Sequence, residues 1–337
     1  MLKILVSRML TTIPALIGVV VVSFLLTRVL PGDTAAYFAG PAATPQAIEE
    51  VRKQLGLDQP LPEQFRRYVV DLSRGDLGKS LTTGQPVLAD LKARLPASAE
   101  LTLFGLLLSL VIAVPLGVVA AVKQGSMIDH ACRAIVTAGV SLPVFFSGLL
   151  LVYVFYFILQ IAPAPLGRLD VFASAPDTVT GFYLIDSLIA GDGATFHASL
   201  TQLLLPGVTL AIFALAPIAR ITRASMLSAL AMEFVRTARA SGLNARTVVM
   251  TYALRNALLP VVTTLGMVFS FLLGANVLVE KVFSWPGIGS YAVEALIASD
   301  FAPVQGFVLA MAIVYILLNL LIDLSYRLID PRMSATS

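Results

Sequence analysis

Six apolar stretches, each about as long as a membrane is thick, constrain this chain more than any other feature. A helix needs about 20 apolar residues to cross a hydrocarbon core of about 30 Å. Because lipid offers no partners to backbone polar groups, such stretches are expected to cross as helices. Five of the six contain no charged residue, and the first carries only Arg28, near its end. They cover residues 9–30, 101–122, 134–161, 198–219, 257–279 and 301–322.

The composition excludes a water-soluble fold. Charged residues make up 13% of the chain and hydrophobic residues 58%, whereas a soluble domain carries about 25% charged residues. So few charges can cover only the parts of a membrane protein that leave the lipid. We therefore predict an all-α membrane protein with six transmembrane helices and lipid as its surroundings.

The distribution of Lys and Arg predicts which side each loop faces. Cytoplasmic loops carry an excess of these residues, counted over short loops. Twelve lie in the segments that would share a side with the termini, against two, Arg168 and Lys281, in the short loops opposite. The twelve are Lys3, Arg8, Lys123, Arg133, Arg220, Arg223, Arg236, Arg239, Arg246, Arg255, Arg327 and Arg332. Both termini should therefore be cytoplasmic.

This orientation divides the chain into three predicted parts. Residues 1–30 form an N-terminal transmembrane helix, residues 31–100 an extracytoplasmic insert, and residues 101–330 a core of five helices. Within the insert, a charged stretch at 48–57 reads as a short amphipathic helix. Within the core, the loop at 220–256 is cytoplasmic and carries six arginines.

Candidate catalytic, metal or cofactor sites are scarce. The single Cys132 excludes a disulfide within the chain, and His130 and His197 lie far from each other in sequence, so we expect no metal site and no cofactor. Gly78-Lys79-Ser80 resembles the end of a phosphate-binding loop, but Ser73 stands where that motif needs a glycine. Without a nucleotide site, ATP hydrolysis would need a separate subunit. We expect no nucleic-acid partner.

The cytoplasmic loop carries the most informative pattern. Apolar residues recur at helical spacing from position 231, whereas Glu233, Arg236 and Arg239 occupy other faces. Gly242 is typical of a residue just past a helix C-terminus, and Asn244 can cap the helix that follows. The apolar positions are Ala231, Phe234, Val235 and Ala238. A helix–glycine–helix of this kind suits docking into a groove of a soluble partner, although it is also compatible with a plain connector.

This loop resembles the EAA loop of binding-protein-dependent ABC importer permeases, in the version of the dipeptide and oligopeptide family. Gly242 matches the motif glycine, and Leu254 matches the motif leucine. Arg236, Thr237 and Ala238 occupy the positions of the motif's Glu-Ala-Ala, so the glutamate is replaced. Arg255 replaces the motif proline. Further family-like stretches lie at 55–61, 74–78, 181–187, 282–289 and 328–332, so the resemblance covers nearly the whole chain.

The resemblance implies a function and a set of partners. It implies a bacterial inner-membrane permease that works with a second homologous permease subunit, two cytoplasmic ATPase subunits and an extracytoplasmic solute-binding protein. The cargo would be short peptides, or, in related systems, glutathione, a nickel complex or haem. The resemblance assigns ATPase coupling to Glu233, Phe234, Arg236, Thr237, Ala238, Arg239, Gly242 and Arg246. The residues of the substrate path cannot be read from the sequence.

Two other classes of function fit less well. A stand-alone channel or secondary transporter predicts charges or broken helices within the spans, and the spans are almost free of charge. A membrane enzyme needs a paired nucleophile and base, which the spans lack. Asp323 and Arg327, four residues apart, form either an ion pair at the end of the last helix or a functional group. Trp285 fits an aromatic belt at the membrane interface.

Overall fold

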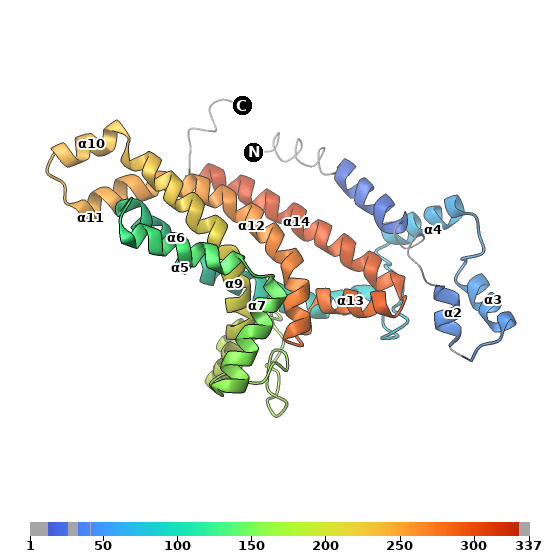
Figure 1. Cartoon of the computed structure of the whole chain (residues 1–337). Coiled ribbons are helices and arrows are strands. Elements are labelled where there is room, and N and C mark those ends of the chain that lie inside the picture. The colour runs from blue at the N-terminus through green and yellow to red at the C-terminus, as the bar shows by residue number, and fades with distance from the viewer. Residues whose placement is uncertain (1–12, 26–32, 41, 330–337) are drawn as a thin grey trace. The chain divides into compact units, whose positions relative to one another are not determined.

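A computed structural model of the chain describes residues 13–25, 33–40 and 42–329, with side chains given throughout except at 34, 37 and 323–329. Within these ranges all named elements are helices, and an isolated bridge between Lys79 and Pro86 is the nearest approach to a strand (Figure 1). The elements follow one another as Ile13–Leu25, α2 (Thr34–Ala39), α3 (Pro45–Gln54), α4 (Leu61–Ser73), α5 (Val87–Val122), α6 (Met127–Val140), α7 (Val144–Leu151), η1 (Val152–Ile158), α8 (Tyr183–Ile189), α9 (Gly193–Leu230), α10 (Glu233–Ala240), α11 (Ala245–Thr247), η2 (Val248–Leu254), α12 (Arg255–Val282), α13 (Ile288–Ile297) and α14 (Phe301–Ile329).

Four helical stretches in the described part of the chain are long and apolar enough to cross a membrane. They are Val87–Val122, Gly193–Leu230, Ala245–Val282 and Phe301–Ile322, and they contain the predicted spans at 101–122, 198–219, 257–279 and 301–322. An all-helical, multi-span membrane protein is thereby confirmed. The predicted first span is described only over Ile13–Leu25, and its two ends lie outside the described residues.

The predicted third span, 134–161, is not one helix. The structure has α6 and, after a break at 141–143, α7 running on into the π-helix η1, with a bend of 98° between the two parts. Pro143 explains the break, because proline has no N–H for a helical hydrogen bond and disfavours helical geometry at Leu142 before it. The pair is either one broken span or a re-entrant loop, so the described residues contain four spans, or five if the pair counts as one.

The helix α9 lies at the centre of the unit formed by residues 97–285 and 318–337. It packs against α6, α7, α8 and α12, and buried residues such as Leu210, Ala214 and Ile218 form its core face. A Cβ atom on Gly117 of α5 would lie 2.6 Å from Cβ of Thr222, which shows that α5 and α9 approach closely. Small residues allow such approaches between membrane helices, where dispersion contacts replace hydrophobic burial as the main attraction.

The second unit combines residues 1–96 with 286–317. Its core joins Val87 and Leu91, at the start of α5, to Ile288 and Tyr291 of α13. The predicted amphipathic helix at 48–57 is confirmed as α3, three residues earlier, because Thr44 caps it by accepting a hydrogen bond from the backbone N–H of Ala47.

The orientation of the chain is open to a direct test. In a Cys132→Ala background, the Lys and Arg count predicts that a cysteine at Gln85 reacts with a membrane-impermeant maleimide added to intact spheroplasts. A cysteine at Lys123, in the turn between α5 and α6, should react only after the membrane is permeabilised. Both positions are exposed, so a lack of reaction reports sidedness instead of burial. The reverse pattern would overturn the predicted orientation.

Candidate functional site

The helix α10 projects from the end of α9 as a short, separate element. Ala231 caps α9, the backbone at Met232 is extended, and α10 then begins at Glu233. The predicted helix therefore starts two residues later than the apolar pattern indicated. Its packed face is Val235 and Ala238, which are buried in one cluster with Val248 of η2. The other predicted apolar residues are exposed, Phe234 by 38%, so the apolar stripe is only partly used within the loop.

Gly242 closes α10 with a complete Schellman motif. Its φ is +77°, its N–H donates to the carbonyl of Arg239, and the N–H of Leu243 donates to the carbonyl of Ala238. These are the two bonds that define the motif, and they satisfy carbonyls that the helix end would otherwise leave unpaired. The predicted glycine turn is confirmed, and it needs glycine because a left-handed backbone is strained for residues with a Cβ.

The return segment begins with the predicted cap. The side-chain oxygen of Asn244 accepts a hydrogen bond of 2.7 Å from the backbone N–H of Thr247. From there α11, η2 and α12 continue as one helical stretch, Ala245–Val282, with a π-helical segment at its start. The loop therefore connects α9 directly to α12, the two helices that pack most extensively against each other.

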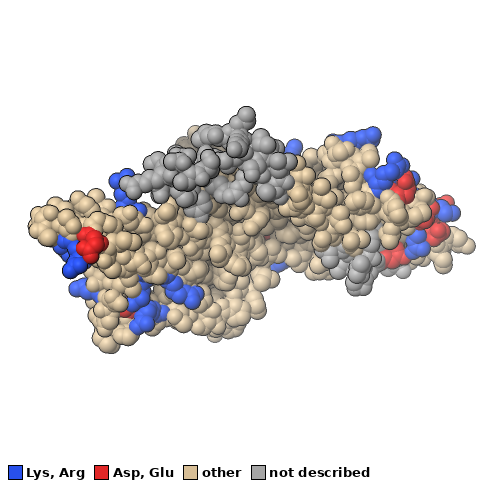
Figure 2. Space-filling view, turned by 90° about the horizontal axis from the view of Figure 1, so that it is seen from above, with Lys and Arg blue, Asp and Glu red and all other residues tan. Residues whose placement is uncertain are grey.

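The outer surface of the loop is basic. Arg236, Arg239 and Arg246 are exposed, and Glu233, also exposed, pairs with Arg236 at 3.0 Å. An ion pair this exposed contributes little to stability, which leaves these side chains available for a partner. Figure 2 shows blue side chains gathered over the α10–α11 end of this unit. Thr237 contributes only a local bond, from its hydroxyl to the carbonyl of Glu233.

A groove of about 450 Å³ lies at the base of the loop. Met232 and Phe234 stand at its edge, and both are exposed by more than a third of their surface. Its lining comes from α9, from the α10 end and from α12, including Ser225, Ser228, Asn256 and Pro260. Phe234 therefore borders an open, largely apolar groove.

Sequence reasoning missed two buried clusters in the same unit. Arg168 donates to Glu100 at 2.6 Å and to the carbonyl of Gly181, and it lies over the ring of Tyr183. Both charged side chains are nearly fully buried, so each needs the other to offset lost hydration. No sequence signal could pair residues so far apart along the chain.

The second missed cluster joins the ends of α5 and α12. The Glu280 carboxylate accepts hydrogen bonds from the Ser98 hydroxyl at 2.5 Å and from the Asn276 amide at 2.9 Å. Next to it, the Trp285 ring N–H donates to the carbonyl of Ala97. Trp285 is only 1% exposed, so the prediction that it belongs to an interfacial belt is wrong. Its ring is packed inside the protein, and its N–H is satisfied there by the carbonyl of Ala97.

Asp186 fixes the loop before α8. Its carboxylate accepts hydrogen bonds from the Thr180 hydroxyl and from the backbone N–H groups of Val179, Thr180 and Gly181. Burial raises the pKa of this carboxyl, but the hydrogen bonds outweigh burial and hold the pKa below its usual value. The charged form is therefore the one that orders this turn.

The segment that begins with Gly78-Lys79-Ser80 already binds a carboxylate of the protein itself. The Asp300 carboxylate accepts hydrogen bonds from the Ser80 hydroxyl at 2.8 Å and from the backbone N–H groups of Leu81 at 2.6 Å and Thr82 at 3.0 Å. These are donors of the kind that a phosphate-binding loop offers to nucleotide. The resemblance to a phosphate-binding loop therefore reflects a structural carboxylate site.

The side chains of Asp323 and Arg327 lie outside the described residues, so their relation is not tested.

The fold and the loop together define a class: a polytopic membrane protein whose central helices are joined by a basic helical hairpin. The comparisons place it further. The chain belongs to the binding-protein-dependent transport system inner membrane components, whose model matches residues 113–335, and a model for the N-terminal part of such membrane components matches residues 1–102.

Curated relatives match the chain over almost its full length. The probable D,D-dipeptide transport system permease protein DdpB of Escherichia coli K12 is 46% identical over 315 residues, covering 94% of this chain and 92% of its own. The dipeptide transport system permease protein DppB of Alkalihalophilus pseudofirmus is 39% identical and covers 98% and 99%. The di/tripeptide permease protein DppB of Pseudomonas aeruginosa is 40% identical and covers 98% of each.

The predicted family is thereby confirmed. The chain is a multi-pass inner-membrane protein and a permease subunit of an ABC importer. Its relatives are permease components, not catalytic subunits. Membership implies a solute-binding protein and ATPase subunits as partners.

Proposed function

We propose that this chain forms half of the transmembrane path of an importer for short peptides, and that the loop at 220–256 couples it to ATPase subunits. The chain has six spans and cytoplasmic termini in this proposal. It pairs with a second homologous permease subunit, two ATPase subunits dock from the cytoplasm, and a solute-binding protein delivers cargo outside. Glutathione, a nickel complex or haem is the alternative cargo for the same machinery.

The observation that carries the coupling role is the rigid connection between α10 and the central helices. Val235 and Ala238 tie α10 to η2, and the Schellman turn at Gly242 fixes the angle between the two arms. A force on α10 therefore reaches α9 at one end and α12 at the other, since no flexible linker intervenes. Movement of packed helices as rigid bodies is the usual way such changes spread through a protein.

The proposed docking surface consists of the side chains that the loop leaves exposed. Phe234, Arg236, Arg239 and Arg246 are exposed, which suits a partner groove that has an apolar floor and acidic groups. An amphipathic helix inserted in such a groove is a recurring mode of recognition. Glu233 and Thr237 act within α10, and Ala238 supports it from the buried side.

Peptides are supported as cargo by the relatives alone. Those with 37% to 46% identity are named for dipeptide, D,D-dipeptide or di/tripeptide transport. The described residues offer no cluster from which a chemical preference can be read. The peptide cargo is therefore an inference from the relatives and does not rest on a binding site.

The coupling role predicts the effect of Gly242→Val. A Cβ at this position meets no atom within 4 Å, so the change acts through backbone strain of roughly 1–2 kcal/mol. The strain should open the turn and tilt α10. We expect normal amounts of protein in the membrane, but at least fivefold less ATPase subunit copurified and a matching loss of uptake.

Gly191→Val is the matched control for this experiment. Gly191 has φ +68° and equally open surroundings, but it lies before the opposite end of α9. It should suffer similar strain and still retain the ATPase subunits. Full docking and uptake by Gly242→Val, or equal loss in both variants, would show that the loop is only a connector.

The cargo proposal predicts a growth phenotype. In a strain without other peptide importers, deletion of this chain should abolish growth of an amino-acid auxotroph on a dipeptide or tripeptide that supplies the required residue. Growth on the free amino acid serves as the control. Unimpaired growth on every peptide, together with lost uptake of glutathione, nickel or haem, would reassign the cargo and leave the permease role intact.

A further inference from the structure

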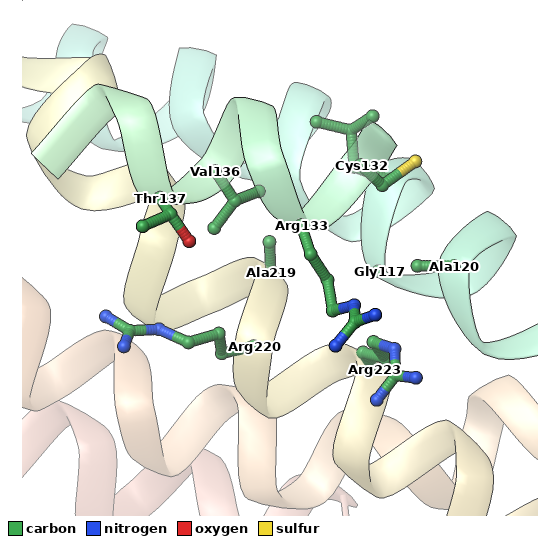
Figure 3. Close-up of a pocket in the computed structure, with 10 residues that line it drawn as sticks. Gly117, Ala120, Cys132, Arg133, Val136, Thr137, Ala219, Arg220 and Arg223 are labelled. Atoms are coloured by element: carbon green, nitrogen blue, oxygen red, sulfur yellow. The ribbon is translucent and has the colours of Figure 1, made fainter. Parts of the chain in front are cut away.

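A cavity of about 100 Å³ lies between α5, α6 and α9, before α10 along the chain. Its walls are largely apolar, with Leu116 and Ala120 from α5, Val136 from α6 and Ala219 from α9. Three arginines also line it: Arg133 of α6 and Arg220 and Arg223 of α9 (Figure 3). An apolar slot with guanidinium groups around it has the chemistry of a site for an amphipathic anion.

The charges around this cavity do not cancel. Arg223 forms two hydrogen bonds with Asp129, at 2.8 and 2.7 Å, and Arg133 lies 3.5 Å from the same carboxylate. Figure 3 shows the Arg133 and Arg223 side chains approaching each other from their two helices, with Arg220 beyond Ala219. Arg220 has no ion pair with another described residue; its Nε donates only to the carbonyl of Ala216. Asp129 thus pairs with Arg223 and Arg133, and Arg220, which also lines the cavity, adds a third guanidinium group without a carboxylate of its own.

The neighbouring histidine adds no negative charge that would balance the arginines. His130 Nδ1 lies 2.6 Å from a terminal nitrogen of Arg133, and since arginine can only donate, this histidine nitrogen accepts and carries no proton. The cavity therefore keeps an excess of two positive charges. Such an excess at the edge of a membrane attracts an anion.

The surroundings favour a lipid over a soluble anion. Beside the cavity, α6 exposes Met127, Ile128 and Ile135 by 83%, 47% and 59%, a surface that suits acyl chains. Arginines at this depth reach the headgroup level by extending along apolar stems. The cavity is too small for a peptide, and it has room for a phosphate with a few methylene groups.

We propose that Arg133, Arg220 and Arg223 hold the headgroup phosphate of an acidic phospholipid against the apolar slot between α5, α6 and α9. Basic pockets between membrane helices bind such headgroups. The predicted orientation places this lipid in the cytoplasmic leaflet, but the site itself does not depend on the cargo or on the coupling role. The bound lipid would join α6, which the break at 141–143 separates from α7, to the central helix α9.

The test uses the assembled complex in detergent, titrated with short-chain phosphatidylglycerol or phosphatidylcholine and read by native mass spectrometry. The variant is Arg133→Gln/Arg220→Gln, which leaves the Asp129–Arg223 pair in place and so keeps the buried carboxylate compensated. Each lost arginine should weaken phosphatidylglycerol binding roughly fivefold. Arg255→Gln removes one positive charge from an exposed position outside the cavity and should leave binding unchanged.

Each of the following outcomes would overturn the proposal. Equal binding of both lipids, or unchanged phosphatidylglycerol binding in the double variant, would show that the arginines do not select a lipid. Displacement of phosphatidylglycerol by millimolar inorganic phosphate would point to a free-anion site. Photo-crosslinking with a diazirine-bearing phosphatidylglycerol should label residues within 116–137 or 216–223; labelling elsewhere, or occupancy of this surface by the second permease subunit, would exclude the lipid.

Discussion

The constraint on which the whole structure depends is that lipid offers no hydrogen-bond partner, so backbone polar groups must be paired within the protein. Backbone groups are paired by making the spans helical, and α9 carries this through 38 residues although Pro206 and Pro217 lie inside it. Several buried polar side chains also pair across elements: Arg168 with Glu100, Glu280 with Ser98, and Arg223 with Asp129. Each pair fixes how two segments are placed along one another, which apolar packing alone does not determine.

The basic residues of the permease then divide into two groups with different tasks. Some, such as Arg223 of α9 and Arg168 in the loop before α8, have carboxylate partners and serve the fold. Those on the loop after α9, such as Arg239 and Arg246, have no ion pair with another described residue and are exposed. This division is consistent with the proposal that a loop which the positive-inside rule alone would make basic also serves as a docking surface. Its buried contacts come from Val235, Ala238 and Val248 on one face, so its other face is left exposed.

Much of the fold and of the loop could be predicted from local sequence. The features that could not be predicted all depend on residues that are far apart along the chain. The spans around α5, α9, α12 and α14, the turn at Gly242 and the cap at Asn244 depend on neighbours along the chain. The burial of Trp285, the Arg168–Glu100 pair and the Asp300 carboxylate beneath residues 80–82 depend on residues brought together by folding. The break at 141–143 lies between these cases. Pro143 can be seen in the sequence, but a proline alone does not tell whether a helix bends slightly or, as here, by 98°.

The central claim is that the outer face of α10 is covered by the ATPase subunits. A cysteine in place of Arg239, in a Cys132→Ala background, can be labelled with maleimide in inside-out vesicles that contain the permease subunits with or without the ATPase subunits. The account predicts rapid labelling of the permease alone and labelling at least tenfold slower in the full complex, while a cysteine at Lys123, in the exposed turn between α5 and α6, reacts equally in both. Equal labelling of the Arg239 position with and without the ATPase subunits would contradict the account.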